Sequence, residues 1–210
     1  VLALNLLPAK RPLSAIKAEH LRKKYWSVVQ QDINEKSLPK FVLDKLPLNL
    51  AYVPLLNHVF ERPKFIVSLR HPLDCILSCY FQDFESNAAM IRTTDLNDTA
   101  VFYVETMGAW LECKKTMDLN FIYVRYEDLI LNKNLELIKV AEFLGVEQDV
   151  ESLDNVGLAL QRDIVNTPSY RQISRPLYRN AINRWKSYTK HLGNCVKIIA
   201  PIAHELGYDI

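Results

Sequence analysis

The sequence lacks several features that would assign it to a special class of protein. No apolar run approaches the length of a membrane span, and Val1–Leu7 is followed rather than preceded by basic residues, the reverse of a secretory signal. Internal repeats and low-complexity tracts are also absent. The net charge is only +2, so charge alone does not indicate a nucleic-acid surface, and any anion would have to be bound by a local cluster.

Cysteine is scarce. Of the four cysteines, only Cys75 and Cys79 lie close together, and no histidine or cysteine pair elsewhere completes a tetrahedral metal site. We therefore expect buried thiols, no metal, no disulfide framework and a reducing, cytoplasmic location. The composition, 49% hydrophobic and 24% charged, is that of a globular domain, and the absence of an initiating methionine leads us to expect a piece of a longer protein.

Apolar periodicity predicts alternating helices and strands. We expect helices over residues 14–35, 50–60, 72–84, 98–117, 134–144, 180–188 and 196–206, and strands over 41–43, 64–69 and 121–124. Asp98 and Thr99 would cap the fourth helix, Gly145 and Gly207 would end two others, and the spans 85–97 and 150–178 would be loops or irregular segments. Short apolar strands separated by helices predict an α/β fold with a parallel sheet and helices on both faces.

Polar residues follow the predicted strands. Arg70 comes directly after the second strand, and Ser78 lies on the helix that follows. Lys45 and Tyr126 stand at or just beyond the ends of the other two strands. Because open α/β sheets bind ligands at the carboxyl ends of their strands, we expect these residues to gather at one edge of the sheet.

These residue types suit a phosphorylated nucleotide. An arginine offers phosphate a planar fork of donors, and the Ser78 hydroxyl adds another donor. Tyr126 can lie against a base, and Lys45 can stabilise charge that develops on a transferred group. Taken alone, each residue also has an ordinary interpretation: a solvated lysine, an ion pair between Arg70 and Asp74, a strand-end aromatic. Their convergence favours group transfer from a nucleotide.

Five stretches resemble sulfotransferases that use 3′-phosphoadenosine 5′-phosphosulfate. They are Asp44–Asn49, Leu69–Gln82, Val124–Leu129, Arg175–Trp185 and Ile199–Asp209. The likeness covers residues 41–210 and is closest to the bacterial branch that is often fused to tetratricopeptide repeats and related to tyrosylprotein sulfotransferases. It implies a P-loop NTPase-like sheet, with residues 1–40 as a helical segment packed on a catalytic domain of residues 41–210.

The resemblance also implies roles for single residues. Arg70 and Ser78 match the pair that holds the 3′-phosphate, and Tyr126 matches the aromatic beside the adenine. Lys45 resembles the lysine that stabilises the sulfuryl group while its bond breaks. The product would be 3′,5′-adenosine diphosphate, and no metal is implied.

Further matches lie near the C-terminus. Arg184 matches a basic residue that contacts the cofactor phosphates, whereas Trp185 is better explained as a core anchor. Two weaker matches in the same segment are Ser169 and Arg179. The small-molecule sulfotransferases use a histidine base in a Lys-Thr-His sequence that this chain does not reproduce, so we assign no histidine, and we expect His71 to help start its helix.

The sequence departs from the family at one important point. Members carry a Pro-Arg/Lys-Ser-Gly-Thr loop that cradles the 5′-phosphosulfate, followed by an acidic general base, and neither occurs among these 210 residues. We therefore expect the chain to be the C-terminal two-thirds of a catalytic domain, with the loop and base upstream. The complete enzyme would transfer a sulfuryl group to a hydroxyl or amine of a small molecule, glycan or peptide.

Other functions are left open by the same departure. A chain without the loop would be a degenerate, catalytically inactive module that binds a nucleotide or another protein. The segment 171–190 is rich in basic and aromatic residues, which would suit an acidic protein partner. A nucleotide kinase is disfavoured because Lys45 precedes Leu46 and Pro47 rather than lying in a glycine-rich turn. A nucleic-acid binder is disfavoured because acidic residues interrupt the basic cluster of residues 10–24. Neither the acceptor nor the oligomeric state follows from the sequence.

Overall fold

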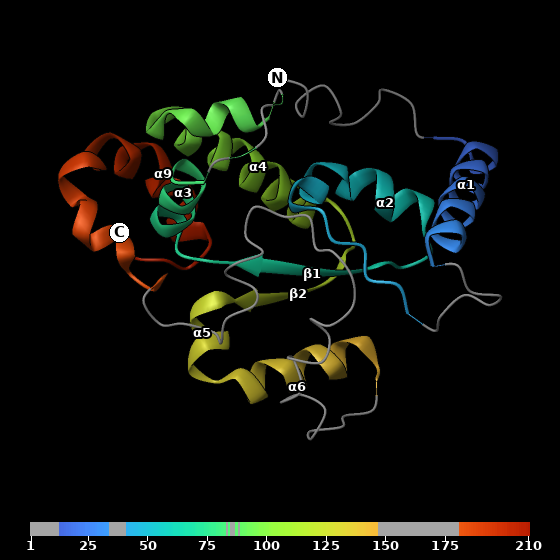
Figure 1. Cartoon of the computed structure of the whole chain (residues 1–210). Helices are drawn as coiled ribbons and strands as arrows, with labels where there is room; N and C mark the ends of the chain where they lie inside the picture. The colour runs from blue at the N-terminus through green and yellow to red at the C-terminus, as the bar shows by residue number, and fades with distance from the viewer. Residues whose placement is uncertain (1–12, 34–40, 83, 85–86, 88, 147–180) are drawn as a thin grey trace. The chain divides into compact units, whose positions relative to one another are not determined.

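The structure is a computed structural model that describes residues 13–33, 41–82, 84, 87, 89–146 and 181–210. Figure 1 shows its elements in order: α1 (Ala15–Ile33), η2 (Pro47–Tyr52), α2 (Val53–Val59), β1 (Lys64–Leu69), α3 (Pro72–Tyr80), η3 (Met90–Thr94), α4 (Leu96–Thr116), β2 (Asn120–Arg125), α5 (Tyr126–Leu131), α6 (Lys133–Leu144), η6 (Arg184–His191) and α9 (Gly193–Glu205). The η elements are 3₁₀ helices.

Contacts divide the chain into two compact units. The first comprises Val1–Lys64 and Thr106–Asn120, and the second Phe65–Glu105 and Phe121–Ile210. The sequence instead predicts a division at residue 40, into a helical segment 1–40 and a catalytic domain 41–210. That division stays a prediction.

In the first unit, α1 packs against α2. Tyr25, Trp26 and Phe60 meet edge to face, with ring centroids 5.1–6.1 Å apart, an arrangement that suits the charge distribution of aromatic rings. Arg22 adds a hydrogen bond from Nε to the carbonyl of Val59 at 2.7 Å. The amphipathic helix predicted over 14–35 is therefore confirmed over the residues that are described.

The strand predicted over residues 41–43 is wrong. Residues 41–46 have no regular structure, and Leu43 is 79% exposed. A run of three apolar residues, Phe41, Val42 and Leu43, is too short to specify a buried strand, because a strand also needs a neighbour that pairs with its backbone groups. Asp44 instead accepts side-chain hydrogen bonds from Tyr25 and Asn49, at 3.2 and 3.3 Å.

The second unit contains most of a small parallel sheet, in which β1 pairs with β2. Val67 and Leu69 of β1 are buried and Ser68 is exposed, as the two-residue period of a strand requires. In Figure 1 both strands run the same way, so that α3 and α5 begin at the same end of the pair. The helix-rich chain with its parallel sheet confirms the predicted α/β fold class.

Helix α3 forms the centre of the second unit. It starts with Pro72 at its first turn, where the missing N–H is not needed, and packs against α9, η3 and η6. Leu73, Ile76 and Leu77 are at most 2% exposed. Full burial of such a side chain stabilises the fold by about 1.5–3 kcal/mol, so this one helix is firmly held.

Helix ends test the capping predictions. Gly145 and Gly207 adopt left-handed φ values of 73° and 75° after α6 and α9, which confirms both as terminators. The cap predicted at Asp98 and Thr99 is wrong, since α4 begins at Leu96. Asp95 caps it, its Oδ1 accepting backbone N–H groups of Asn97 and Asp98 at 2.8 and 3.0 Å.

Candidate functional site

Arg70 and Tyr126 meet where the two strands end. The guanidinium carbon of Arg70 lies 5.2 Å from the centroid of the Tyr126 ring, within the range of a cation–π contact. Arg70 Nη2 also donates a hydrogen bond of 2.7 Å to the carbonyl of Ala181. The structure thus brings together two of the residues that the sequence places at strand ends.

The Nε–H of Arg70 is buried and has no hydrogen-bond partner in the described part of the chain. A buried donor left without an acceptor costs free energy, about 1–3 kcal/mol and more when charged. Phosphate and carboxylate oxygens are the acceptors that a guanidinium fork fits best. The residue is therefore suited to the phosphate that the sequence analysis expects it to hold.

Ser78 lies in the second half of α3, the helix that follows Arg70. It is half-buried, and Cys75 precedes it by one turn. A hydrogen bond between the Cys75 and Cys79 thiols raises the pKa of Cys75 and lowers the pKa of Cys79, and the charge of Arg70 lowers the pKa of both. All four cysteines are free thiols, Cys113 and Cys195 fully buried and the other two half-buried.

Arg184 is the first residue of η6 and lies beside the C-terminal end of α3. Its guanidinium carbon is 5.0 Å from the ring centroid of Phe81 and 5.9 Å from that of Tyr188. Phe81 is the C-cap residue of α3, three residues beyond Ser78. One helix therefore carries Ser78 and the aromatic ring on which Arg184 rests.

Asp74 is a site-forming residue that the sequence analysis did not identify. It is 1% exposed, and its two carboxylate oxygens accept the backbone N–H groups of Asn183 and Trp185, each at 2.8 Å. These bonds replace the ion pair with Arg70 that was one interpretation of the sequence. An aspartate in the first turn of a helix ordinarily complements the helix dipole, so nothing in the sequence pointed to a segment so distant along the chain.

His71 and Glu127 join the start of α3 to the C-terminus. His71 is the N-cap residue of α3, as expected; its backbone N–H donates to Glu127 Oε1 at 2.8 Å, and its Nε2 lies 2.9 Å from the carbonyl oxygen of Asp209. Trp185 stacks on the His71 ring at 5.0 Å. The second Glu127 oxygen accepts the Tyr208 hydroxyl at 3.2 Å.

The other predicted site residues, Lys45, Ser169 and Arg179, stay predictions. Lys45 is exposed in the first unit and does not follow a strand, so its convergence with Arg70 stays a prediction. Ser169 and Arg179 lie outside the described residues. Across the ranges that the structure describes, no three histidine, cysteine or acidic side chains form a group that could hold a metal ion.

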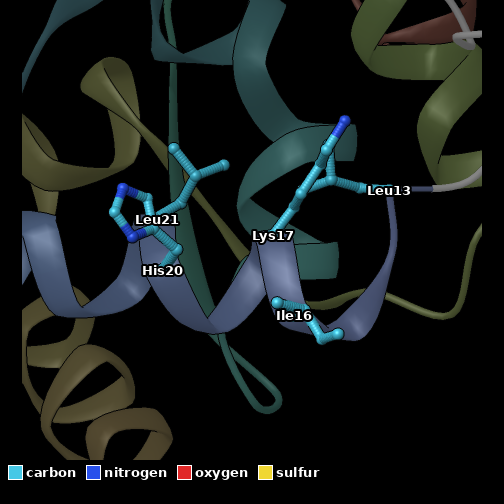
Figure 2. Close-up of a pocket in the computed structure, with 5 residues that line it drawn as sticks. All are labelled: Leu13, Ile16, Lys17, His20 and Leu21. Atoms are coloured by element: carbon cyan, nitrogen blue, oxygen red, sulfur yellow. The ribbon is translucent and has the colours of Figure 1, made fainter.

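A groove in the first unit has a different character. Figure 2 shows the side chains that line it, those of Leu13 and of the α1 residues Ile16, Lys17, His20 and Leu21. The volume of this groove is about 350 Å³. The lining is mostly apolar, and Ile16 is 81% exposed. Nothing in this groove resembles the arginine, hydroxyl and aromatic set of the second unit.

No helix within the described ranges is both long and apolar enough to pass through a lipid bilayer.

Comparison with known proteins agrees with the resemblance noted in the sequence. A family model described as the Sulfotransferase family matches residues 7–150. An uncharacterized protein of Aquifex aeolicus is 24% identical over 159 residues, which are 75% of this chain and 20% of that protein. Protein-tyrosine sulfotransferase A of Caenorhabditis elegans is 23% identical over 178 residues, which are 79% of this chain and 44% of that protein.

A solved structure shows a similar fold. The sulfotransferase domain from the curacin biosynthetic pathway has a TM-score of 0.64 and 18% identity, covering 89% of this chain and 68% of its own. The chain spans less than half the length of the two curated relatives. Because the family model matches more than half of the residues, the chain belongs to the sulfotransferase family.

Proposed function

We propose that this chain binds 3′-phosphoadenosine 5′-phosphosulfate and forms part of an enzyme that transfers its sulfuryl group to a hydroxyl or amine. The observation that supports this most is the buried Nε–H of Arg70, which has no hydrogen-bond partner among the described residues and lies beside the Tyr126 ring at the end of two parallel strands. Arg70 and Ser78 would hold the 3′-phosphate, and Tyr126 would lie beside the adenine. Arg184, with Ser169 and Arg179, would contact the phosphates.

The donor supplies an activated sulfuryl group. In the transfer, the bond from sulfur to the bridging phosphate oxygen breaks, a bond forms to the acceptor oxygen or nitrogen, the acceptor loses its proton to a base, and 3′,5′-adenosine diphosphate leaves. Lys45 would stabilise the negative charge that develops on the bridging oxygen. The phosphate contacts fix the donor so that displacement can occur in line.

The acceptor class is part of the proposal. The name of the C. elegans relative suggests a tyrosine of a protein, and a small molecule or glycan is the other class. We place the enzyme in the cytoplasm because the cysteines are free. A second candidate is a module that binds the nucleotide without turnover, because the sequence contains no Ser-Gly-Thr loop.

Calorimetric titration with 3′,5′-adenosine diphosphate tests the binding site. The unaltered chain is expected to bind, and Arg70→Ala to weaken binding by roughly tenfold or more, the effect of losing a charge-assisted hydrogen bond. Lys115→Ala removes one exposed positive charge on α4 and is the matched control, expected to bind normally. Equal affinities for all three proteins, or no binding by the unaltered chain, would contradict the site.

A further inference from the structure

Two side chains of opposite charge hold a short backbone segment against the start of α3. Arg70 Nη2 donates to the carbonyl of Ala181 at 2.7 Å, and the Asp74 carboxylate accepts the N–H groups of Asn183 and Trp185 at 2.8 Å. We name this arrangement the 181–185 clasp; it consists of the Arg70 and Asp74 side chains and the backbone of residues 181, 183 and 185. Residues 181, 183 and 185 are thus each held through one backbone group.

The clasp holds the backbone on both sides of Arg184. The two N–H groups bound by Asp74 belong to the residues directly before and after Arg184. Asn183 has a φ of 59°, the left-handed conformation that turns the chain into η6. Hydrogen bonds from backbone N–H groups to an ionised carboxylate are among the stronger ones, and Asp74 is 1% exposed, so water competes little for it.

The side chain of Arg184 is held by a separate contact. Its guanidinium lies over the Phe81 ring at 5.0 Å, and Phe81 lies at the other end of α3 from Asp74. A cation over an aromatic ring stays available for further hydrogen bonds, because the ring takes up none of the five N–H donors. Helix α3 thus places the backbone of Arg184 with Asp74 and its guanidinium with Phe81.

We infer that Asp74 and Phe81 are positioning residues that hold Arg184 ready for a phosphate group of the nucleotide. This inference rests on the proposed function. Neither residue touches the nucleotide; both act through Arg184. The alternative is that Asp74 and Phe81 only stabilise the fold, in which case their effects on nucleotide binding would not depend on Arg184.

A thermodynamic cycle separates these possibilities. Calorimetry with 3′,5′-adenosine diphosphate is carried out on Asp74→Asn, Phe81→Leu and Arg184→Ala, and on each of the first two combined with Arg184→Ala. Arg184→Ala is expected to lower affinity roughly tenfold, and Asp74→Asn and Phe81→Leu to lower it severalfold. In the Arg184→Ala background both changes are expected to have no further effect. Asp98→Asn, at an exposed aspartate of α4, is the control for the charge change.

A second measurement reports on the clasp without the nucleotide. Hydrogen exchange of the Asn183 and Trp185 amides is expected to be slow in the unaltered chain and much faster in Asp74→Asn. Equal exchange rates in the two proteins would overturn the inference, as would effects of Asp74→Asn or Phe81→Leu that are the same in both backgrounds. Phe81 is 46% exposed, so Phe81→Leu keeps the cycle decisive if Asp74→Asn does not fold.

The outcomes also distinguish the two proposals. Normal nucleotide binding that Arg70→Ala weakens, together with uncoupled effects of Asp74→Asn and Phe81→Leu, would overturn only the positioning. Absence of binding by the unaltered chain would overturn the proposed function and the positioning with it.

Discussion

At the scale of single residues, two phenols link protonation to folding. Burial raises the pKa of Tyr103 above its usual value of about 10, and nearby thiol, phenol and carboxyl groups raise it further. Burial likewise raises the pKa of Tyr208, and the Glu127 carboxylate that accepts its hydroxyl adds to the effect. Both phenols therefore remain neutral in the folded chain at a pH where they ionise in the unfolded chain.

This gives a signed prediction for Tyr103. The unfolded chain releases the proton first, so the free energy of unfolding is constant with respect to this group below pH about 10 and falls as the pH rises further. Above that pH, the unaltered chain is expected to lose up to about 1.4 kcal/mol per pH unit more than Tyr103→Phe. Urea unfolding measured at several alkaline pH values gives the comparison.

The control is Tyr52→Phe, since Tyr52 is 42% exposed. It should leave the pH dependence as it is in the unaltered chain. An identical alkaline loss of stability in Tyr103→Phe and the unaltered chain would show that the Tyr103 phenol is not buried as described.

Which site residues the sequence could predict depends on what each one contacts. Arg70 and Tyr126 follow apolar strands, and parallel strands end at the same edge, so their proximity was predictable from the chain order. The role of Asp74 was not, because its partners are backbone N–H groups, which any residue supplies. When a side chain binds backbone groups, no complementary residue type marks its partner in the sequence, so the contact cannot be predicted from residue identities.

At the scale of elements, Glu127 joins three parts of the second unit. It is the second residue of α5 and accepts the N–H of His71 at the start of α3 and the hydroxyl of Tyr208 after α9. Glu127→Gln keeps the shape but removes the negative charge, so the His71 N–H and the Tyr208 hydroxyl both lose a charge-assisted acceptor, and the hydroxyl must turn to accept from the new amide. We expect the free energy of unfolding to fall by about 1–3 kcal/mol, measured by urea denaturation.

Glu142→Gln serves as the control, because Glu142 is exposed on α6. It should change the unfolding free energy only slightly. A Glu127→Gln chain as stable as the Glu142→Gln chain would mean that the α3, α5 and C-terminal contacts do not depend on this carboxylate.

The two left-handed glycines offer a matched pair. Gly145 has a φ of 73°, so Gly145→Ala places a side chain in the left-handed region and is expected to destabilise the chain by about 1–2 kcal/mol. A Cβ at Gly207 would also lie 3.0 Å from Arg125 Nη2, which donates to the carbonyl of Leu206. Gly207→Ala should therefore lower the free energy of unfolding, measured by thermal unfolding, by more than the roughly 1–2 kcal/mol of the left-handed conformation alone; a smaller loss would argue against that contact.

Elements were predictable where the local pattern was decisive. The strand over 64–69 matches its prediction because an apolar run ends there at Arg70 and is followed by Pro72. The prediction of a strand over 41–43 is wrong because a run of three apolar residues does not indicate which strand, if any, would pair with it. The start of α4 was placed too late because Asp95 and Asp98 are chemically equivalent as caps, and only the hydrogen bonds of Asp95 distinguish them.

At the scale of the whole molecule, the sequence was enough to predict the α/β class and the family. It was not enough to predict where Lys45 lies relative to Arg70. They belong to different units, and Lys45 has no strand before it to define its place. The chain also spans only 20% and 44% of its two curated relatives, so turnover is a property to be measured on the complete protein.

For that complete protein, Lys45→Ala is expected to reduce sulfuryl transfer far more than donor affinity, because its charge would be needed while the bond breaks. Steady-state rates and equilibrium binding of 3′,5′-adenosine diphosphate give the two quantities. Lys115→Ala should alter neither. Unchanged turnover in Lys45→Ala would remove this residue from the mechanism.

The central claim is that Arg70 holds the 3′-phosphate of an adenine nucleotide. Its most direct test is the ratio of affinities for 3′,5′-adenosine diphosphate and adenosine 5′-monophosphate, which lacks the 3′-phosphate, in the unaltered chain and in Arg70→Ala. We predict a preference of roughly tenfold or more in the unaltered chain that falls to near one in Arg70→Ala. A preference that survives the substitution, or none in the unaltered chain, would contradict the claim.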